Sequence, residues 1–303
     1  MAFWTAVIVF VAVEGALVYA MIKFRRRPSL GMPRQSHGNT RLEVAWTIAP
    51  VLVLAVIAVP TVTTIFDTAN LPPGEVLEVT VTGHQWWFEF EYPEQGITTA
   101  NELYVPVGKT VNLTLLSDDV IHSFWVPKLF CKTDMIPRNT NTMWFSADEA
   151  GEYLGQCAEF CGSAHAQMRF RVIAEDEASF SDWVAAQQTP PVRPVSGTQE
   201  AQGELVFGLK GCGSCHTVSG AEREGRQQAR MAAFLAREED VLSPYPAPNL
   251  THFASRGTFG GSVEDLTEAN LRLWLEDPSS LKPGRAWSNW PRRTTRRVWC
   301  PRR

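Results

Sequence analysis

Residues 157–168 read Cys-Ala-Glu-Phe-Cys-Gly-Ser-Ala-His-Ala-Gln-Met and carry the densest chemistry of this chain. The metal-binding side chains in the stretch are Cys157, Cys161, His165 and Met168. Upstream, His122 is a candidate for a further imidazole ligand. Soft sulfur combined with imidazole selects copper, zinc or iron–sulfur chemistry. A blue-copper site uses one cysteine, so the second thiolate favours two copper ions that share both sulfurs, a centre built for electron transfer.

Three other interpretations of this stretch stay open on the residues alone. The spacing of the four side chains would place them on one face of a helix, although Gly155 and Gly162 disfavour a helix interior. A disulfide between Cys157 and Cys161 would suit an oxidising compartment. A tetrahedral zinc site with two Cys and two His fits the ligand count but leaves Met168 without a role. We favour the binuclear copper centre.

Length and charge bound the class of protein. A chain of 303 residues predicts about two domains. The formal charge is −4, but residues 285–303 hold seven Arg and no acidic residue, which leaves residues 1–284 with 21 basic and 32 acidic side chains and a charge of −11. An acidic body argues against a nucleic-acid partner and favours a basic or membrane-associated one. Outside the cofactor motifs, we interpret Cys131 as a buried free thiol.

Two apolar segments predict a transmembrane hairpin. Residues 3–22 contain one charge, Glu14, and residues 45–66 contain none. Each segment is long enough to cross a bilayer, which takes about 20 helical residues. Glu14 is costly in a bilayer unless paired, and we interpret it as a contact to a neighbouring subunit helix. The connecting loop is rich in Lys and Arg, which places it in the cytoplasm, so everything after residue 67 is expected on the outer side.

From Val76 onwards the pattern changes to short β-branched and aromatic runs separated by turn residues. About seven such runs predict a sandwich or Greek-key barrel, with the metal loop between two late strands. The predicted strands are Val76–Gly83, Trp86–Tyr92, Leu103–Val105, Thr110–Leu116, His122–Val126, Asn141–Phe145 and Met168–Ala174. The aromatic run from Trp86 to Phe90 is either core packing, which composition alone favours, or an electron-entry surface beside the metal.

Together these motifs resemble subunit II of the cytochrome c oxidase family over about residues 3–175. The matching stretches are Leu42-Glu43-Val44-Ala45-Trp46-Thr47 with Pro50, Gly83-His84-Gln85-Trp86-Trp87, Asp119-Val120-Ile121-His122-Ser123-Phe124, Lys132-Thr133-Asp134-Met135-Ile136-Pro137 and the Cys157–Met168 loop. The resemblance implies a cupredoxin fold with a binuclear copper A centre. The ligands it implies are His122, Cys157, Cys161, His165, Met168 and the backbone carbonyl of Glu159.

The same resemblance gives two further residues a role and shows one departure. It implies that the Glu159 carboxylate helps to bind a magnesium ion at the contact with subunit I. It also implies that Trp86 is the electron-entry residue. Arg138 stands where the family usually has glycine, so a bulky side chain is expected to disturb a turn there.

The C-terminal third carries a second cofactor motif. The run Cys212-Gly213-Ser214-Cys215-His216 has the C-x-x-C-H pattern that attaches haem c covalently, with His216 as the proximal iron ligand. The segment resembles the small class I cytochrome c domain fused to subunit II in some bacterial oxidases. Residues 248–253 resemble the stretch that gives a backbone contact to the proximal histidine. The predicted helices in this part of the chain are Glu177–Gln188, Gln199–Leu209 and Leu266–Leu275.

Two features depart from such a haem domain. Residues 221–247 are longer and more charged than the corresponding loop, and predict an extra amphipathic helix around Met231. The distal methionine is expected shortly after Lys282, but no methionine follows Met231. The distal position then falls to Met231, to His252 or to no side chain. We interpret residues 285–303 as out-of-frame translation of a GC-rich gene, with a genuine divergent tail as the alternative.

The predicted organisation is a multi-domain membrane protein. Its parts are a two-helix transmembrane hairpin (1–70), an all-β cupredoxin copper A domain (71–175), a short helix and linker (176–197), and a small all-α cytochrome c domain (198–303).

These features predict the electron-input subunit of a bacterial terminal haem-copper oxidase in the inner (plasma) membrane. Electrons would pass from cytochrome c or another periplasmic donor, through the fused haem c and copper A, to subunit I, where oxygen reduction is coupled to proton pumping. Expected partners are subunit I, the other oxidase subunits, the donor and the lipid bilayer. The attached haem would raise the local concentration of the carrier.

Two rival functions follow from parts of the same pattern. A membrane-tethered electron shuttle would need no acidic bridge to subunit I, so Glu159 disfavours it. A nitrous-oxide-reductase-like copper A protein would not need the membrane hairpin. A quinol-oxidase subunit is excluded because that branch has lost the copper ligands present here.

Overall fold

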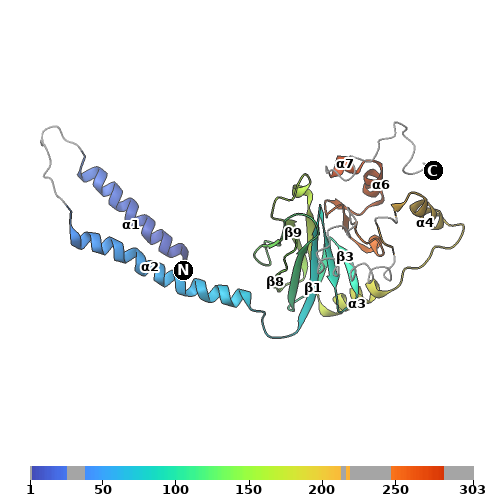
Figure 1. Ribbon diagram of the computed structural model, residues 1–303, viewed down its shortest axis with the longest axis horizontal. Helices are drawn as coiled ribbons and strands as arrows, with labels where there is room; N and C mark the ends of the chain where they lie inside the picture. The colour runs from blue at the N-terminus through green and yellow to red at the C-terminus, as the bar shows by residue number, and fades with distance from the viewer. Residues whose placement is uncertain (1, 26–37, 213–215, 219–246, 283–303) are drawn as a thin grey trace. The chain divides into compact units, whose positions relative to one another are not determined.

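The computed structural model describes residues 2–25, 38–212, 216–218 and 247–282. They belong to two units, Met1–Leu71 and Pro72–Arg303, which we describe separately (Figure 1). Several predictions lie outside the described residues. These predictions are the haem attachment by Cys215, the amphipathic helix around Met231 and the out-of-frame translation of residues 285–303.

The first unit consists of two long apolar helices, α1 (Ala2–Lys23) and α2 (Thr40–Ala69). Both are long and apolar enough to cross a membrane, which agrees with the predicted hairpin. α2 begins upstream of the predicted span because the Asn39 side chain caps it, accepting a hydrogen bond from the backbone N–H of Leu42 at 3.3 Å.

The second unit contains a sandwich of two five-stranded sheets (Figure 1). In order across the first sheet, the strands are β3 (Ile97–Ala100), β2 (Trp87–Tyr92), β1 (Val76–His84), β5 (Thr110–Ser117) and β8 (Asn141–Phe145). Across the second they are β4 (Glu102–Pro106), β10 (Arg169–Glu175), β9 (Gly151–Cys157), β6 (His122–Trp125) and β7 (Thr133–Met135). The β1–β5 and β4–β10 pairs are parallel. The predicted cupredoxin-like sandwich is confirmed.

Alternating side chains of both sheets form one core beneath the metal loop. β1 and β5 bury every second residue, as expected for strands with one face on a core. Phe170 packs against Phe88 and Phe124, with ring centroids 4.7 Å and 4.6 Å apart. Fully burying such a side chain stabilises the fold by about 1.5–3 kcal/mol. Because Phe124 follows His122 by two positions and Phe170 follows Met168 by two, the core fixes the strands that carry these ligands.

Three strands of the two large sheets, β3, β7 and β9, were not predicted. β9 was missed because Gly151 and Gly155 argue against regular structure in a sequence pattern. In the sheet, Gly155 pairs with Phe170, and a Cβ on Gly155 would lie 2.3 Å from that ring. The glycine is therefore required for a close approach, a reason that local sequence does not reveal.

The C-terminal part begins with two helices at their predicted bounds, α3 (Glu177–Gln188) and α4 (Gln199–Leu209). It continues after residue 247 with short elements. These are η4 (Phe253–Ser255), β11 (Thr258–Phe259), β12 (Glu264–Asp265), α6 (Glu268–Glu276) and α7 (Pro278–Leu281). Since β11 and β12 pair as a hairpin, the described part of this region is not purely helical, and the predicted all-α class is not confirmed.

Arg138 occupies a left-handed backbone conformation, with φ at 64°. Residues with a Cβ adopt this region at a cost of roughly 1–2 kcal/mol, whereas glycine adopts it readily. A positive φ explains why glycine suits this position. The turn nevertheless forms with Arg138 in place of glycine.

We predict that Arg138→Gly is more stable than Arg138→Ala by about 0.5–1 kcal/mol, because both variants lose the Arg138 side chain and glycine alone adopts the left-handed conformation without strain. Thermal unfolding should show a Tm higher by a few degrees for Arg138→Gly than for Arg138→Ala. Asn101→Gly is the contrasting variant. Asn101 also has a positive φ, of 62°, but its side chain accepts a hydrogen bond from Phe88 N–H at 2.9 Å, so this change should destabilise the protein. A lower Tm for Arg138→Gly than for Arg138→Ala would contradict the strain argument.

Candidate metal centre

The predicted ligands come from two strands and the loop between β9 and β10. His122 is the first residue of β6 and Cys157 the last of β9, and these strands pair antiparallel with Phe124 opposite Cys157. The loop then returns through the 3-10 helix η2 (His165–Gln167). It closes where Cys157 N–H donates to the carbonyl of Met168 at 2.9 Å. Sheet pairing thus brings His122 to the two ends of the loop.

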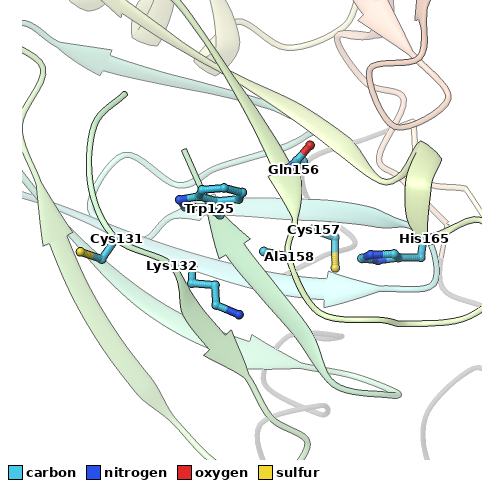
Figure 2. Close-up of a pocket in the computed structure, with 7 residues that line it drawn as sticks. All are labelled: Trp125, Cys131, Lys132, Gln156, Cys157, Ala158 and His165. Atoms are coloured by element: carbon cyan, nitrogen blue, oxygen red, sulfur yellow. The ribbon is translucent and has the colours of Figure 1, made fainter. Parts of the chain in front are cut away.

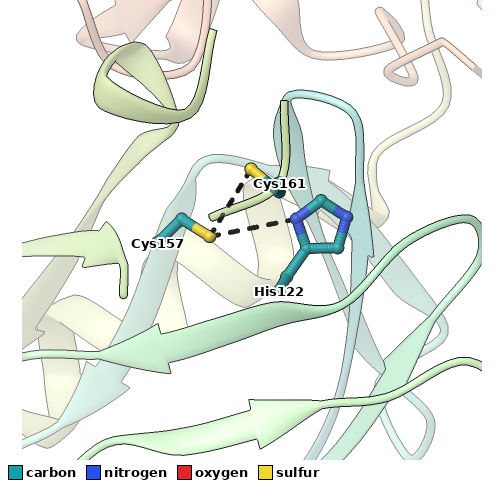
Figure 3. Close-up of side chains that lie close together, drawn as sticks. All are labelled: His122, Cys157 and Cys161. Atoms are coloured by element: carbon teal, nitrogen blue, oxygen red, sulfur yellow. Dashed lines mark hydrogen bonds between the residues drawn. The ribbon is translucent and has the colours of Figure 1, made fainter. Parts of the chain in front are cut away.

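The donor atoms of these residues converge (Figure 3). The ligand atoms of His122, Cys157 and Cys161 all lie within 4.8 Å of one another. The sulfurs of Cys157 and Cys161 are 3.7 Å apart, and Cys157 Sγ lies 3.9 Å from His122 Nδ1. Cys161 Sγ lies 3.5 Å from His165 Nδ1 and 3.7 Å from Met168 Sδ. The backbone oxygen of Glu159 is 3.2 Å from Cys157 Sγ. All six predicted donors, the two cysteine sulfurs included, therefore lie close together.

This geometry decides between the interpretations that the sequence left open. The stretch is not a helix, since a strand ends at Cys157 and three 3-10 residues begin at His165. The sulfurs at 3.7 Å are too far apart for a disulfide, whose S–S bond is about 2.05 Å. A tetrahedral zinc ion takes four ligands and would leave two donors unused. Two thiolates flanked by imidazole, thioether and carbonyl donors fit a binuclear copper site.

The ring of His122 is held by shape and by charge. A Cβ on Gly83 would lie 2.8 Å from His122 Cδ2, so glycine in β1 leaves the space that the imidazole occupies. On the other side, His122 Nε2 and Asp119 Oδ1 are 2.8 Å apart. This pairing leaves Nδ1 directed at Cys157, the arrangement by which a carboxylate orients a metal-binding histidine.

The pKa directions reflect the same contacts. Burial alone would raise the pKa of Asp119, but hydrogen bonds from His122 and from the N–H groups of Val120 and Gln85 outweigh it and lower that pKa. Burial would lower the pKa of His122, yet its bonds to Asp119 and Cys157 raise it. Asp119 is thus an ionised partner for the imidazole. Sequence reasoning missed this role, for which the spacing of three residues before His122 was the available signal.

A hydrogen bond couples the two thiols, whose sulfurs are 3.7 Å apart. The hydrogen bond shared with Cys161 is the main reason that the pKa of Cys157 falls to about 3. The same bond, with burial, raises the pKa of Cys161. A cation that binds both sulfurs must displace the remaining proton, which couples metal loading to proton release.

The loop is also braced from the aromatic run. The backbone oxygen of Cys161 accepts hydrogen bonds from Gln85 Nε2 at 2.6 Å and from the indole Nε1 of Trp86 at 2.9 Å. Trp86 is half-buried against the core. The structure therefore places this residue in direct contact with a predicted ligand residue.

A hollow of about 620 Å³ borders Cys157 and His165 (Figure 2). It is lined by Trp125, Cys131, Lys132, Gln156, Cys157, Ala158 and His165. Cys131 is a free thiol, as expected, but it is exposed, so the prediction of a buried side chain was wrong. It lies between β6 and β7, outside the sandwich core. Next to His165, the Phe160 ring is 75% exposed and stacks edge-on at 5.8 Å.

At the haem-attachment motif, Cys212 and His216 are described. His216 Nδ1 lies 2.8 Å from the carbonyl oxygen of Pro248, the backbone contact expected for a proximal histidine. That contact leaves Nε2 as the nitrogen that can face a metal. Burial is the main cause that lowers the pKa of His216, which favours the neutral, ligating form of the ring.

Fold and site define the class of protein: two apolar helices followed by a cupredoxin-like domain with a cluster of side chains that could hold a metal ion. Comparison with known families agrees. Residues 95–175 match the periplasmic domain of cytochrome c oxidase subunit II, and residues 1–64 match its transmembrane domain. This chain belongs to the cytochrome c oxidase subunit II family. It is accordingly a subunit of an electron-accepting haem-copper oxidase, with a periplasmic domain whose family implies a copper A site.

Two relatives of known name support this assignment. A cytochrome c oxidase subunit 2 from Alkalihalophilus pseudofirmus is 36% identical over 295 residues, which cover 94% of this chain and 80% of the relative. One from Bacillus subtilis is 34% identical over 287 residues, which cover 88% of this chain and 74% of the relative. Among solved structures, the periplasmic domain of subunit II of cytochrome oxidase from Bradyrhizobium japonicum is 31% identical. The matched region covers 39% of this chain and 97% of the Bradyrhizobium chain, with a TM-score of 0.38.

We predict that Asp119→Asn weakens copper binding by about 10- to 100-fold, because the amide no longer supplies the charge that orients His122. Copper titration of the metal-free protein, followed by the near-infrared absorption, measures this affinity. Asp148→Asn is the matched control, since Asp148 is exposed and, among the residues that the structure describes, accepts a hydroxyl hydrogen bond from Ser146 at 3.4 Å. Equal affinities for the two variants would show that Asp119 does not orient the ligand.

Proposed function

We propose that this chain is the electron-input subunit of a bacterial terminal oxidase, carrying copper A in its cupredoxin domain and a covalent haem c in its C-terminal region. The observation that carries the proposal is the convergence of six soft and carbonyl donors around the Cys157–Cys161 sulfur pair. The proposed copper ligands are His122, Cys157, Cys161, His165, Met168 and the carbonyl of Glu159. A binuclear copper centre supplies one-electron transfer when it is bound.

The protein groups keep that centre rigid and dry. Cys157, Cys161 and Met168 are buried, and His122 is fully covered. Asp119 holds the His122 ring, while Gln85 and Trp86 hold the carbonyl of Cys161. A site fixed by surrounding strands rearranges little when its charge changes, which suits rapid electron exchange. We assign Trp86 as the electron-entry residue on this contact.

Residues 159 and 160 supply the surface toward the partner. Glu159 follows Cys157 by two positions and is half-buried, and the adjacent Phe160 is exposed. We propose that Glu159 contributes a carboxylate to a magnesium ion at the contact with subunit I, where oxygen is reduced. An exposed aromatic side chain such as Phe160 is typical of a protein–protein contact.

The haem assignment rests on Cys212, Cys215 and His216, and on the contact of His216 with Pro248. The relative from A. pseudofirmus aligns over 94% of this chain, so its similarity extends past residue 175 into this region. Residues 198–303 are proposed as the haem domain, 176–197 as helix and linker, 71–175 as the copper domain and 1–70 as the membrane hairpin. The proposed distal ligand of the haem iron is Met231, His252 or no side chain. The donor is cytochrome c or another periplasmic carrier, and the membrane is the bacterial inner membrane.

The predicted spectrum tests both cofactors at once. The purified complex should show a near-infrared copper band and a c-type haem spectrum. His122→Ala should abolish the copper band and leave the haem band, because His122 is a ligand of one site only. His216→Ala should do the converse. Loss of both bands in each variant, with the fold retained by circular dichroism, would contradict two separate sites.

The tethered shuttle remains the alternative function. It predicts a protein that carries both cofactors but purifies without a many-span haem-copper subunit. Co-purification with such a subunit, and its loss on Glu159→Ala, separates the two functions.

A further inference from the structure

The segment formed by residues 247–282 contacts the cupredoxin domain through a buried carboxylate. Glu102, the first residue of β4, is 1% exposed. Its side chain accepts hydrogen bonds from the N–H of Thr258 at 2.7 Å, the hydroxyl of Thr258 at 2.8 Å and the N–H of Gly257 at 3.3 Å. A buried carboxylate is costly unless its oxygens are paired, and here the paired donors come from a segment 155 residues later in the chain.

A second contact next to Glu102 makes the arrangement specific. The hydroxyl of Ser262 donates to the backbone oxygen of Asn101 at 3.1 Å and lies 3.0 Å from the hydroxyl of Thr258. Ser262 has a positive φ of 53°, a left-handed conformation that is unfavourable for a residue with a Cβ. Such a conformation persists where surrounding contacts determine it. The backbone conformation of the hairpin formed by β11 and β12 is therefore stabilised by its contacts with Asn101 and Glu102 at the start of β4.

The same hairpin touches the metal loop and the aromatic run. Arg169, the residue after Met168, donates its N–H to the carbonyl of Gly261 at 3.0 Å. A Cβ on Gly261 would lie 3.0 Å from the backbone oxygen of Gln167 and 3.2 Å from that of Trp86. Lys282 Nζ also donates to the backbone oxygen of Trp86 and, at 2.8 Å, to that of Gly260. Backbone on both sides of Met168 is thus in contact with the segment.

A short chain of contacts continues from this hairpin to the haem-attachment histidine. Arg256 donates to the carbonyl of Asn249 at 2.5 Å, next to the Pro248 carbonyl that His216 contacts at 2.8 Å. Leu250 N–H donates to the carbonyl of Thr217, the neighbour of His216, at 2.8 Å. His216 and Glu102 are therefore joined by consecutive short-range contacts.

We propose that Glu102 is a positioning residue that holds residues 247–282, and with them His216, in one fixed arrangement on the cupredoxin domain. This inference rests on the proposed function. The inference adds a detail to that function. A haem domain on a flexible tether must still find its docking surface, because the tether only raises the local concentration of the haem. A carrier held by the Glu102 contact has no docking step. Electron exchange between the two cofactors then does not wait for an encounter.

Hydrogen exchange tests the contact itself without reference to activity. In the full-length protein, the amides of Gly257 and Thr258 should be protected. Glu102→Gln replaces an acceptor oxygen with an NH₂ donor that opposes these N–H groups. Loss of a hydrogen bond to a charged group should speed their exchange by roughly 10- to 100-fold, while strands β1 and β5 keep their protection.

Two further variants keep the test falsifiable. Thr258→Val removes the hydroxyl from the other side of the contact without touching the cupredoxin domain, and should also speed exchange. The double variant should do little more than Glu102→Gln alone, because both changes break one contact. Glu78→Gln is the control: Glu78 is a half-buried carboxylate in β1 whose partner, Asn112 Nδ2 at 2.8 Å, lies in the same domain. It should leave the exchange of residues 257–266 unchanged.

Flash reduction of the haem then tests the consequence for function. In the wild type, electron transfer from the haem to the copper centre should be independent of solvent viscosity. In Glu102→Gln it should be slower by at least about tenfold and fall as viscosity rises, while both absorption bands are retained.

Two results would overturn the inference. The first is exchange within twofold of the wild type in both Glu102→Gln and Thr258→Val. The second is a wild-type rate that already depends on viscosity. Absence of a c-type haem spectrum from the wild type would instead refute the haem assignment and leave the exchange result standing, so the two proposals fail separately.

Discussion

The pairing of β6 with β9 is the contact on which the site depends. His122 and Cys157 are 35 residues apart, and the antiparallel register with Phe124 opposite Cys157 brings them together. The register is enforced because Phe124 points into the core, where it meets Phe170 two residues after Met168. A slip by one residue would turn Phe124 out of the core and His122 away from the sulfurs. The same strand register therefore determines both the packing of Phe124 in the core and the position of His122 beside the sulfurs.

Local sequence predicted the features that depend on neighbours along the chain. The bounds of α3 and α4 were correct, and the predicted donors in residues 157–168 lie close together, because caps, turn residues and ligand spacing are short-range signals. β9 was missed because its glycines look like breaks, although Gly155 is needed for the ring of Phe170 across the sheet. Glu102 gave no signal either, since its partners lie in another part of the chain. Prediction failed where the physical cause is a contact between distant strands.

The aromatic run shows how one motif meets two demands. Gly83 leaves room for the His122 ring, and Trp86 donates its indole N–H to the carbonyl of Cys161. Composition favoured core packing for Trp86 and the family resemblance favoured a role in electron entry. The half-buried side chain packs against the core and also contacts the loop, so packing does not exclude the second role.

The loop between β9 and β10 is restrained from three directions. Asp119 acts through His122, Gln85 and Trp86 act on the carbonyl of Cys161, and Gly261 accepts the N–H that follows Met168. The third restraint comes from the C-terminal segment. A displacement of that segment would remove a hydrogen bond one residue from a proposed copper ligand. The position of this segment and the shape of the proposed copper site are therefore physically linked, which a flexible tether would not require.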